Sequence, residues 1–215
     1  MKLVSLNVGV PRSVHWREKT VSTGIFKDPV LRTLRLGLLN LEGDQQADLT
    51  VHGGPDKALY AYAAEHYTAW KSELGRDELP WGMFGENFTL EGGLFEDQIF
   101  VGDRFSAGTA EIVAVQPRMP CYKLGVRFGT QRIVQQFARA RRYGVYFRVL
   151  KEGLVAVGDP VTKIGESDSR ISIRDVGRLL LEEPDDLALA ARAATAEFLP
   201  EHMREHFQQL VEESK

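Results

Sequence analysis

Cysteine is nearly absent from this sequence: Cys121 is the only one among 215 residues. A single thiol cannot form a disulfide within the chain, which excludes a small secreted domain held together by disulfides. No apolar run is long enough to span a bilayer, and the first residues lack the apolar core and small-residue cleavage site of a signal peptide. We therefore expect a cytoplasmic protein with no membrane partner.

Positive charge is not in excess either. The chain has 27 lysines and arginines against 30 aspartates and glutamates, which gives a formal net charge of −3. A protein that binds nucleic acid in bulk needs a basic surface, so this class of partner is disfavoured. A local basic site for a small anion remains open.

The signatures of several common enzyme classes are also missing. The sequence contains no Walker A loop, no G-x-G-x-x-G pattern, no G-x-S-x-G elbow and no internal repeat. The five histidines form no metal-binding pattern, because His202 and His206 lie four residues apart without a third ligand nearby. We interpret these two as surface residues of a helix.

Short extended segments separated by Gly, Pro and Asp fill the first three-quarters of the chain. Hydrophobic residues make up 43% of the sequence, enough for a sizeable core. The strongest strand candidates are residues 2–8, 20–26, 34–39, 99–105, 111–116, 143–150 and 154–157. The last two are separated by a Lys-Glu-Gly turn and are expected to form a hairpin. Many short strands predict a mainly β fold, a barrel or a sandwich.

Helical patterns interrupt the strands twice and then replace them. One helix is predicted over residues 55–74, because Pro55 suits a first helical position and apolar residues follow at helical spacing. A second begins near Thr130. After Gly165 a polar linker precedes three amphipathic helices, the first opened by a possible capping box at residues 172–175. The sequence therefore predicts a β domain over residues 1–165 and a three-helix segment over residues 166–215.

Cys121 is the first candidate for chemistry. It lies between Pro120 and Tyr122, with Arg118, Lys123 and Arg127 close in sequence. Cations beside a thiol favour the thiolate, which is the nucleophile and the ligand for soft metals. A buried cysteine that acts only as a small hydrophobic side chain is the competing interpretation, and the residues alone leave both open.

Residues 48–57 form a second candidate. His52, Gly53 and Gly54 precede a predicted helix, and Lys57 follows in its first turn. Glycines let a backbone approach a ligand closely, and a helix start offers unpaired N–H groups, so this segment would suit a phosphate or another oxyanion. The alternative is a simple turn before a helix, with His52 as its cap.

Three further segments have a functional and a structural interpretation. Glu86 and Asn87 could serve a polar pocket or could sit in a tight turn that enters a strand. Lys27 precedes an Asp-Pro turn and, unless it converges with the other candidates, is a solvated charge. The basic run 139–143 with Arg148 could bind phosphates or a nucleobase, or could be a solvated loop or pair with local acids.

Taken together, these motifs resemble one family. The ordered set comprises Gly43-Asp44-x-Gln46-Ala47-Asp48, His52-Gly53-Gly54-x-Asp56-Lys57-Ala58, Gly85-Glu86-Asn87, Gln116-Pro117-Arg118-x-Pro120-Cys121-x-Lys123-Leu124 and Gly158-Asp159. In this order and spacing, over roughly residues 1–165, they are similar to the MOSC domain, named for the C-terminal part of molybdenum-cofactor sulfurases. From Ile171 onward the tail resembles the three-helix domain of bacterial YiiM-type proteins.

The resemblance implies a β-barrel with interspersed helices that houses a molybdenum-cofactor site of the molybdopterin type. In such proteins the cysteine that matches Cys121 ligates molybdenum or is proposed to carry sulfur as a persulfide. The remaining candidates would hold the cofactor, namely His52, Gly53, Gly54, Lys57, Asn87, Arg118, Lys123 and Lys27. Glu86 would orient the substrate or donate a proton. A purified sample can lack the cofactor.

The activity implied by the resemblance is reduction of N-hydroxylated base analogues such as 6-hydroxyaminopurine. The sequence has no motif for an electron source, so a separate flavin or iron–sulfur partner would supply electrons. A second hypothesis is a carrier that stores the cofactor, or a persulfide on Cys121, without turnover. A third is a scaffold whose helical tail docks a partner.

Overall fold

The structure is a computed structural model that describes residues 1–47 and 53–214. The strands are β1 Lys2–Val8, β2 Arg12–Trp16, β3 Lys19–Thr23, β4 Asp28–Val30, β5 Leu34–Leu36, β6 Leu59–Ala63, β7 Phe88–Glu91, β8 Arg104–Ala107, β9 Ala110–Pro117, β10 Val145–Lys151, β11 Gly153–Val155 and β12 Val161–Gly165. The helices are α2 Ala64–Leu74, α3 Tyr122–Phe128, α4 Arg132–Ala140, α5 Ile173–Leu181, α6 Leu187–Ala194 and α7 Glu201–Glu213, with a 3₁₀ turn η1 at Pro55–Lys57.

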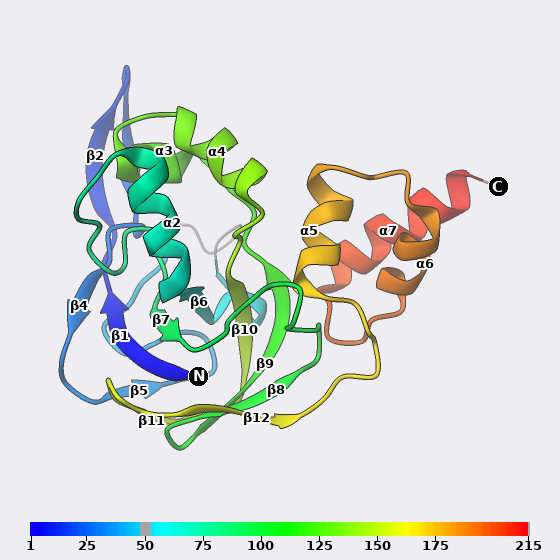
Figure 1. The fold of residues 1–215 in the computed structure, drawn as a ribbon, viewed down its shortest axis with the longest axis horizontal. Helices are drawn as coiled ribbons and strands as arrows, with labels where there is room; N and C mark the ends of the chain where they lie inside the picture. The colour runs from blue at the N-terminus through cyan, green and yellow to red at the C-terminus, as the bar shows by residue number, and fades with distance from the viewer. Residues whose placement is uncertain (48–52, 215) are drawn as a thin grey trace.

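One sheet organises the molecule. Its eight strands lie in the order β12-β8-β9-β10-β6-β7-β1-β4. Neighbouring strands are antiparallel except β6 and β7, which are parallel and are joined by a connection that contains α2. Figure 1 shows α2, α3 and α4 grouped at one end of this sheet, and α5, α6 and α7 grouped beside it.

The expected closed barrel is wrong, because β12 and β4 are edges of the sheet as the structure describes it. The edge of β1 that faces away from β7 is divided between two neighbours. Its second half pairs with β4, and its first residues bond to residues 158–161, for example Leu3 N to the Asp159 carbonyl at 3.0 Å. That contact is an isolated bridge between Lys2 and Pro160. It draws the two ends of the sheet together without completing a ladder.

Several predicted strands and helices also differ from the structure. β11 pairs with β5 in a separate two-stranded sheet, so it forms no hairpin with β10. Residues 59–63 are a strand and not the start of the first helix; all five are buried, and a fully buried strand carries no alternation that would distinguish it from a helix. In the predicted strand over residues 99–105, Phe100 forms only an isolated bridge with Ser172, residues 101–102 are a turn, and the strand β8 begins at Arg104. The short helix α3 was not predicted.

An aromatic cluster underlies the end of the sheet that carries α2, α3 and α4. Trp70 of α2 stacks on Phe137 of α4, with ring centroids 6.2 Å apart and planes inclined by 6°. Phe84 lies between the helices, 5.2 Å from the ring of Phe128 in α3. Aromatic rings bury large areas and prefer such offset contacts, so this cluster fixes α3 relative to β6.

The three C-terminal helices pack on the sheet as expected. The capping box at the start of α5 is confirmed: the Asp175 N–H donates to Ser172 Oγ, and the Asp175 carboxylate accepts from the Ser172 N–H. One apolar core includes residues of β1, β9 and α5 as well as Phe207 of α7. The tail therefore shares a core with the sheet, and the domain boundary at residue 165 stays a prediction.

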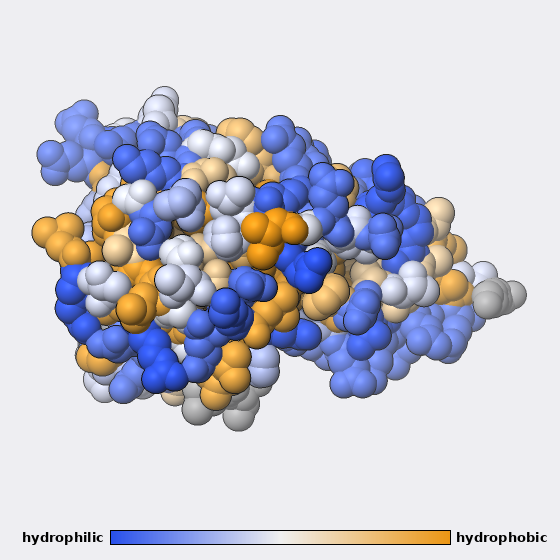
Figure 2. All heavy atoms as spheres, turned by 90° about the horizontal axis from the view of Figure 1, so that it is seen from below, coloured by the Kyte–Doolittle hydropathy of each residue, from blue (hydrophilic) through white to orange (hydrophobic). Residues whose placement is uncertain are grey.

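Figure 2 shows hydrophilic and hydrophobic residues intermixed on one face of the molecule. No helix in the described part of the chain is long and apolar enough to cross a membrane.

We expect Gly177→Leu to weaken the docking of α5. A Cβ at Gly177 would lie 2.3 Å from Cε2 of Tyr143, a ring that is itself buried. Overpacking of this kind costs about 1–3 kcal/mol. Urea denaturation should show that loss in the free energy of unfolding, whereas Gly37→Ala, with its nearest neighbours at 3.4 Å, should be close to neutral. Equal stability of the two variants would contradict this packing.

Candidate functional site

A pocket at the end of the sheet brings together residues from distant parts of the chain. Its lining includes most of the predicted site: Cys121, Arg118, Lys123, Lys57, Lys27 and Asn87. The other lining residues are Thr23, Gly24, Ile25, Asp44, Gln45, Gln46, Ala47, Tyr60, Gly85, Met119 and Tyr146.

Cys121 lies between the end of β9 and the start of α3. β9 ends at Pro117 and α3 begins at Tyr122, so Cys121 is the last extended residue before the helix. The residue is partly exposed and lines the pocket, so it is not a fully buried hydrophobic side chain. Leu124 of α3 is buried in the aromatic cluster, and this anchors the helix behind the cysteine.

Arg118 supplies a buried positive charge beside the cysteine. The residue is 7% exposed, and its Nη1 donates to the Phe84 carbonyl at 2.6 Å. Its guanidinium carbon lies 5.2 Å from the centre of the Tyr60 ring. Burial lowers its pKa, but the phenols of Tyr60 and Tyr146 raise it, and the net direction is upward. In the described part of the chain no carboxylate forms an ion pair with Arg118; its contacts there include the Phe84 carbonyl, the Tyr60 and Tyr146 side chains and the nearby Cys121.

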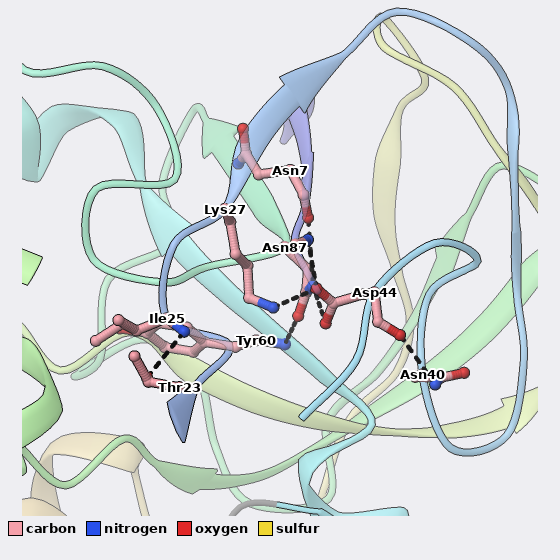
Figure 3. Close-up of polar contacts among 9 residues, drawn as sticks. Asn7, Thr23, Ile25, Lys27, Asn40, Asp44, Tyr60 and Asn87 are labelled. Carbon is pink, nitrogen blue, oxygen red and sulfur yellow. Dashed lines mark hydrogen bonds and ion pairs between the residues drawn. The ribbon is translucent and has the colours of Figure 1, made fainter. Parts of the chain in front are cut away.

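Lys27 is neutralised by a buried partner, as Figure 3 shows. Its Nζ donates to Asp44 Oδ1, and the same oxygen accepts from the Gly9 N–H at 2.9 Å. The other oxygen, Oδ2, accepts from Asn87 Nδ2 at 2.9 Å. Asn87 Oδ1 in turn accepts from the Tyr60 N–H at 3.2 Å. This network ties five separate segments into one wall of the pocket.

Two lysines of the pocket, Lys27 and Lys57, have pKa values shifted in the same direction. Burial lowers the pKa of Lys27, and Asp44 only partly restores it. Burial also lowers the pKa of Lys57, with Asp56 raising it. Both ammonium groups therefore lose their protons more readily than a free lysine, and an anion bound between them would favour their charged forms.

Glu86 is placed behind the pocket wall. It is fully buried and accepts four hydrogen bonds, from the Tyr67 hydroxyl, the Gly82 and Phe84 N–H groups at 2.9 and 3.1 Å, and Thr89 Oγ1 at 3.0 Å. Burial raises its pKa, against these hydrogen bonds. The carboxylate thus organises the turn at residues 82–86, and its predicted catalytic role stays a prediction.

The described part of the segment 48–57 contributes only Lys57 to the lining of the pocket. His52 lies outside the described residues. Gly54 has a φ of 90°, which favours glycine, and Gly53 and Gly54 precede the 3₁₀ turn rather than a full helix. Neither glycine is among the described residues that line the pocket, although Lys57 of the same segment is.

The basic run pairs with acidic side chains that are far away in sequence. Arg142 contacts Glu73 of α2, and Arg148 Nε donates to Asp56 Oδ1 at 2.8 Å. Arg141 pairs with Glu182 at the end of α5. Arg141, Arg142 and Arg148 are thus paired, although their partners are not the local acids that were expected. The pair of Arg148 and Asp56 joins η1 to β10.

Tyr60 and Tyr146 were missed as site residues. They come from the neighbouring strands β6 and β10, and their rings lie 5.0 Å apart. Asp44 was part of the motif set but had no assigned role. Only strand register brings the tyrosines together, so no local sequence signal would have identified them.

Comparison with known proteins matches residues 48–162 to the MOSC domain. The chain belongs to the MOSC domain family. It is 38% identical to the uncharacterized protein YflK of Bacillus subtilis over 95% of this chain and 92% of that protein. The crystal structure of YiiM from Geobacillus stearothermophilus superposes with a TM-score of 0.82 at 32% identity, covering 98% of both chains. A Gibberella moniliformis protein named reductase is 30% identical over 69% of this chain and 27% of its own length.

The residues present fit the cofactor associated with this family. A thiol offers a soft ligand for molybdenum, and the buried Arg118 lacks a carboxylate partner in the described chain. An anionic phosphate would supply the missing countercharge, with Lys57 and Lys123 on the same lining. The described residues contain no cluster of three or more His, Cys, Asp and Glu side chains suited to an ion alone.

Asp44→Asn should destabilise the protein strongly. The change leaves the ammonium of Lys27 buried without its carboxylate, and breaking a buried ion pair costs about 3–5 kcal/mol. The free energy of unfolding from urea titrations measures this loss. A loss below 1 kcal/mol, the range of an exposed pair, would contradict the described pairing.

The same substitution has a pH signature. Since the pKa of Lys27 is lower in the folded protein than the usual 10.5, stability decreases as pH falls from 10.5 toward that lowered pKa. Removing Asp44 lowers this pKa further, so the decrease should extend closer to neutral pH in Asp44→Asn. Lys27→Met, which has no group to titrate, should remove this part of the dependence.

Proposed function

We propose that the pocket binds a molybdopterin-type cofactor and reduces N-hydroxylated nucleobases such as 6-hydroxyaminopurine. The observation that carries the proposal is the buried Arg118, which has no carboxylate partner among the described residues, on the wall that also presents Cys121. Membership of the MOSC family and a relative named reductase support an oxidoreductase. A cytoplasmic location is part of the proposal.

Each side chain of the pocket has a role in this scheme. Cys121 Sγ would ligate the metal, and Arg118, Lys57 and Lys123 would bind the phosphate of the cofactor. Asn87, whose amide bonds to Asn7, Asp44 and Tyr60, would form a fixed part of the wall beside the pterin. When bound, the cofactor supplies two-electron redox chemistry.

The proposed reaction cleaves the N–O bond of the substrate. Two electrons and two protons convert R–NH–OH to R–NH₂ and water. The electrons come from a separate flavin or iron–sulfur protein. The two protons are taken up from solvent.

Replacing Cys121 by Ala should remove both metal and activity while leaving the fold intact. The thiol is at the pocket surface, so its loss creates no large cavity. We would measure molybdenum by elemental mass spectrometry, and 6-hydroxyaminopurine reduction with a chemical electron donor, in protein from a host with intact cofactor synthesis. Leu181→Ala, at a residue 39% exposed in α5, is a matched control that should retain both.

Full metal loading and full turnover in Cys121→Ala would refute the role of the thiol. A folded wild-type protein without molybdenum, under conditions that load another molybdoenzyme, would instead favour the carrier hypothesis. In that case a persulfide on Cys121 should be detectable by mass spectrometry of the intact protein.

Glu86→Gln separates a structural from a catalytic carboxylate. A purely structural role predicts a loss of about 1–3 kcal/mol in unfolding free energy, because the amide group meets hydrogen-bond donors, with no change in the shape of the pH–rate profile. A proton donor with a pKa above 4.5 would give a limb on which activity falls as pH rises, and the variant would lose that limb. We expect the first result.

A further inference from the structure

A second hollow adjoins the site and is not used by the proposed chemistry. It lies between the β2–β3 hairpin and the start of α3 and is called here the hairpin groove. Its lining residues are Trp16, Arg17, Glu18, Lys19, Val21, Tyr122 and Gln131. Figure 1 shows the hairpin extending beyond the main sheet beside α3.

The hairpin groove and the Cys121 pocket share two walls. Tyr122 lines the groove and Cys121, the preceding residue, lines the pocket. On β3, Val21 lines the groove and Thr23 lines the pocket. Residues two apart in a strand point to the same face, so one face of β3 runs from the groove into the pocket. The groove is therefore a continuation of the pocket away from the cysteine.

Aromatic side chains stand on both sides of the groove. Trp16 is paired with Lys19 across the hairpin, so its ring lies on the same face as Val21. Tyr122 on the opposite wall is 47% exposed, which is unusual for so large a ring. Two accessible rings on facing walls are a typical means of holding a flat aromatic ligand, because bases stack on aromatic side chains.

Polar groups at the groove match the edge of a purine. Gln131 has an amide that can both donate and accept, as recognition of an adenine edge requires. It packs over Gly125, where an added Cβ would lie 2.5 Å from Gln131 Oε1. Arg17 adopts a φ of 55° at the hairpin turn, and its guanidinium carbon lies 5.9 Å from the centre of the Trp16 ring. A non-glycine residue held in this region costs stability, and such strain often marks a functional segment.

The hairpin is anchored at its base and so can hold a ligand at its tip. Arg12 of β2 lies over the ring of Phe26 at 3.7 Å from its centre, and Arg127 of α3 lies on the same ring at 5.0 Å. These two contacts join the base of the hairpin to the far end of α3. The distance between the Trp16 and Tyr122 walls is thereby fixed by packing that the ligand does not have to create.

We infer that the hairpin groove is the binding site for the purine ring of the substrate, stacked between Trp16 and Tyr122. This inference rests on the proposed function for its choice of ligand. It explains how one pocket can reduce an exocyclic N–OH group: the ring is held in the groove, and only the nitrogen substituent extends toward Cys121. Specificity for purines then resides in the hairpin and not in the cofactor pocket.

The test measures adenine binding to metal-free protein by isothermal titration calorimetry. Loss of base stacking is worth roughly tenfold or more in affinity, so Trp16→Leu and Tyr122→Leu should each weaken adenine binding by about that factor. His15→Leu is the matched control, because His15 is exposed on the opposite face of the same strand. It should bind adenine like the wild type, and all variants should show the wild-type circular dichroism spectrum.

A kinetic readout uses loaded protein. Trp16→Leu should raise KM for 6-hydroxyaminopurine about tenfold and leave turnover of hydroxylamine, which has no ring, unchanged. Unchanged adenine affinity in Trp16→Leu, or no adenine binding by the wild type, would overturn the inference. Adenine binding needs no metal, so a wild-type protein that binds adenine through Trp16 but contains no molybdenum would refute the proposed function alone.

Discussion

The buried ion pair between Lys27 and Asp44 is the interaction on which the candidate site depends. A charge pair removed from water is stable only when its remaining hydrogen-bonding capacity is satisfied. Here Asp44 also accepts from the Gly9 N–H and from Asn87 Nδ2, so the pair connects the end of β1, the segment before β4 and the start of β7. β1 and β7 are already neighbours in the sheet, and the Asn7 N–H donates to the Asn87 carbonyl at 2.7 Å. The ion pair adds the irregular segments that carry Lys27 and Asp44 to this wall.

The opposite wall is held by a different kind of interaction. Cys121 and Arg118 lie in the link between β9 and α3, and α3 is too short to be stable alone. Its position depends on the aromatic cluster, in which Phe84 contacts Phe128. The Phe84 carbonyl also accepts from Arg118. Phe84 therefore links the hydrophobic packing of α3 to the charged side chain of Arg118. The wall with Lys27 and Asp44 is held by polar contacts, and the wall with Cys121 is held by aromatic packing.

How much of this was predictable depends on whether a feature is local. The strand at residues 2–8, the capping box at Ser172 and the functional segment around Cys121 are local patterns, and the structure retains them. The prediction of a barrel was wrong because closure depends on how one edge of β1 is shared between two neighbours. The predicted helix over residues 55–74 was wrong at its start, because a strand that is buried on both faces shows no alternation of apolar and polar residues. Tyr60 entered the site only through the register of β6 and β10.

The cations at the pocket differ in the partners that the described residues give them. Lys27 has its countercharge within the protein, and Arg148 is paired with Asp56. Arg118 is as deeply buried as Lys27, yet among the described residues it interacts with the Phe84 carbonyl, with Tyr60 and Tyr146 and with the nearby Cys121, and no carboxylate forms an ion pair with it. A buried charge is costly unless it is paired. We therefore propose that an anionic ligand in this pocket, beside Cys121, supplies the countercharge.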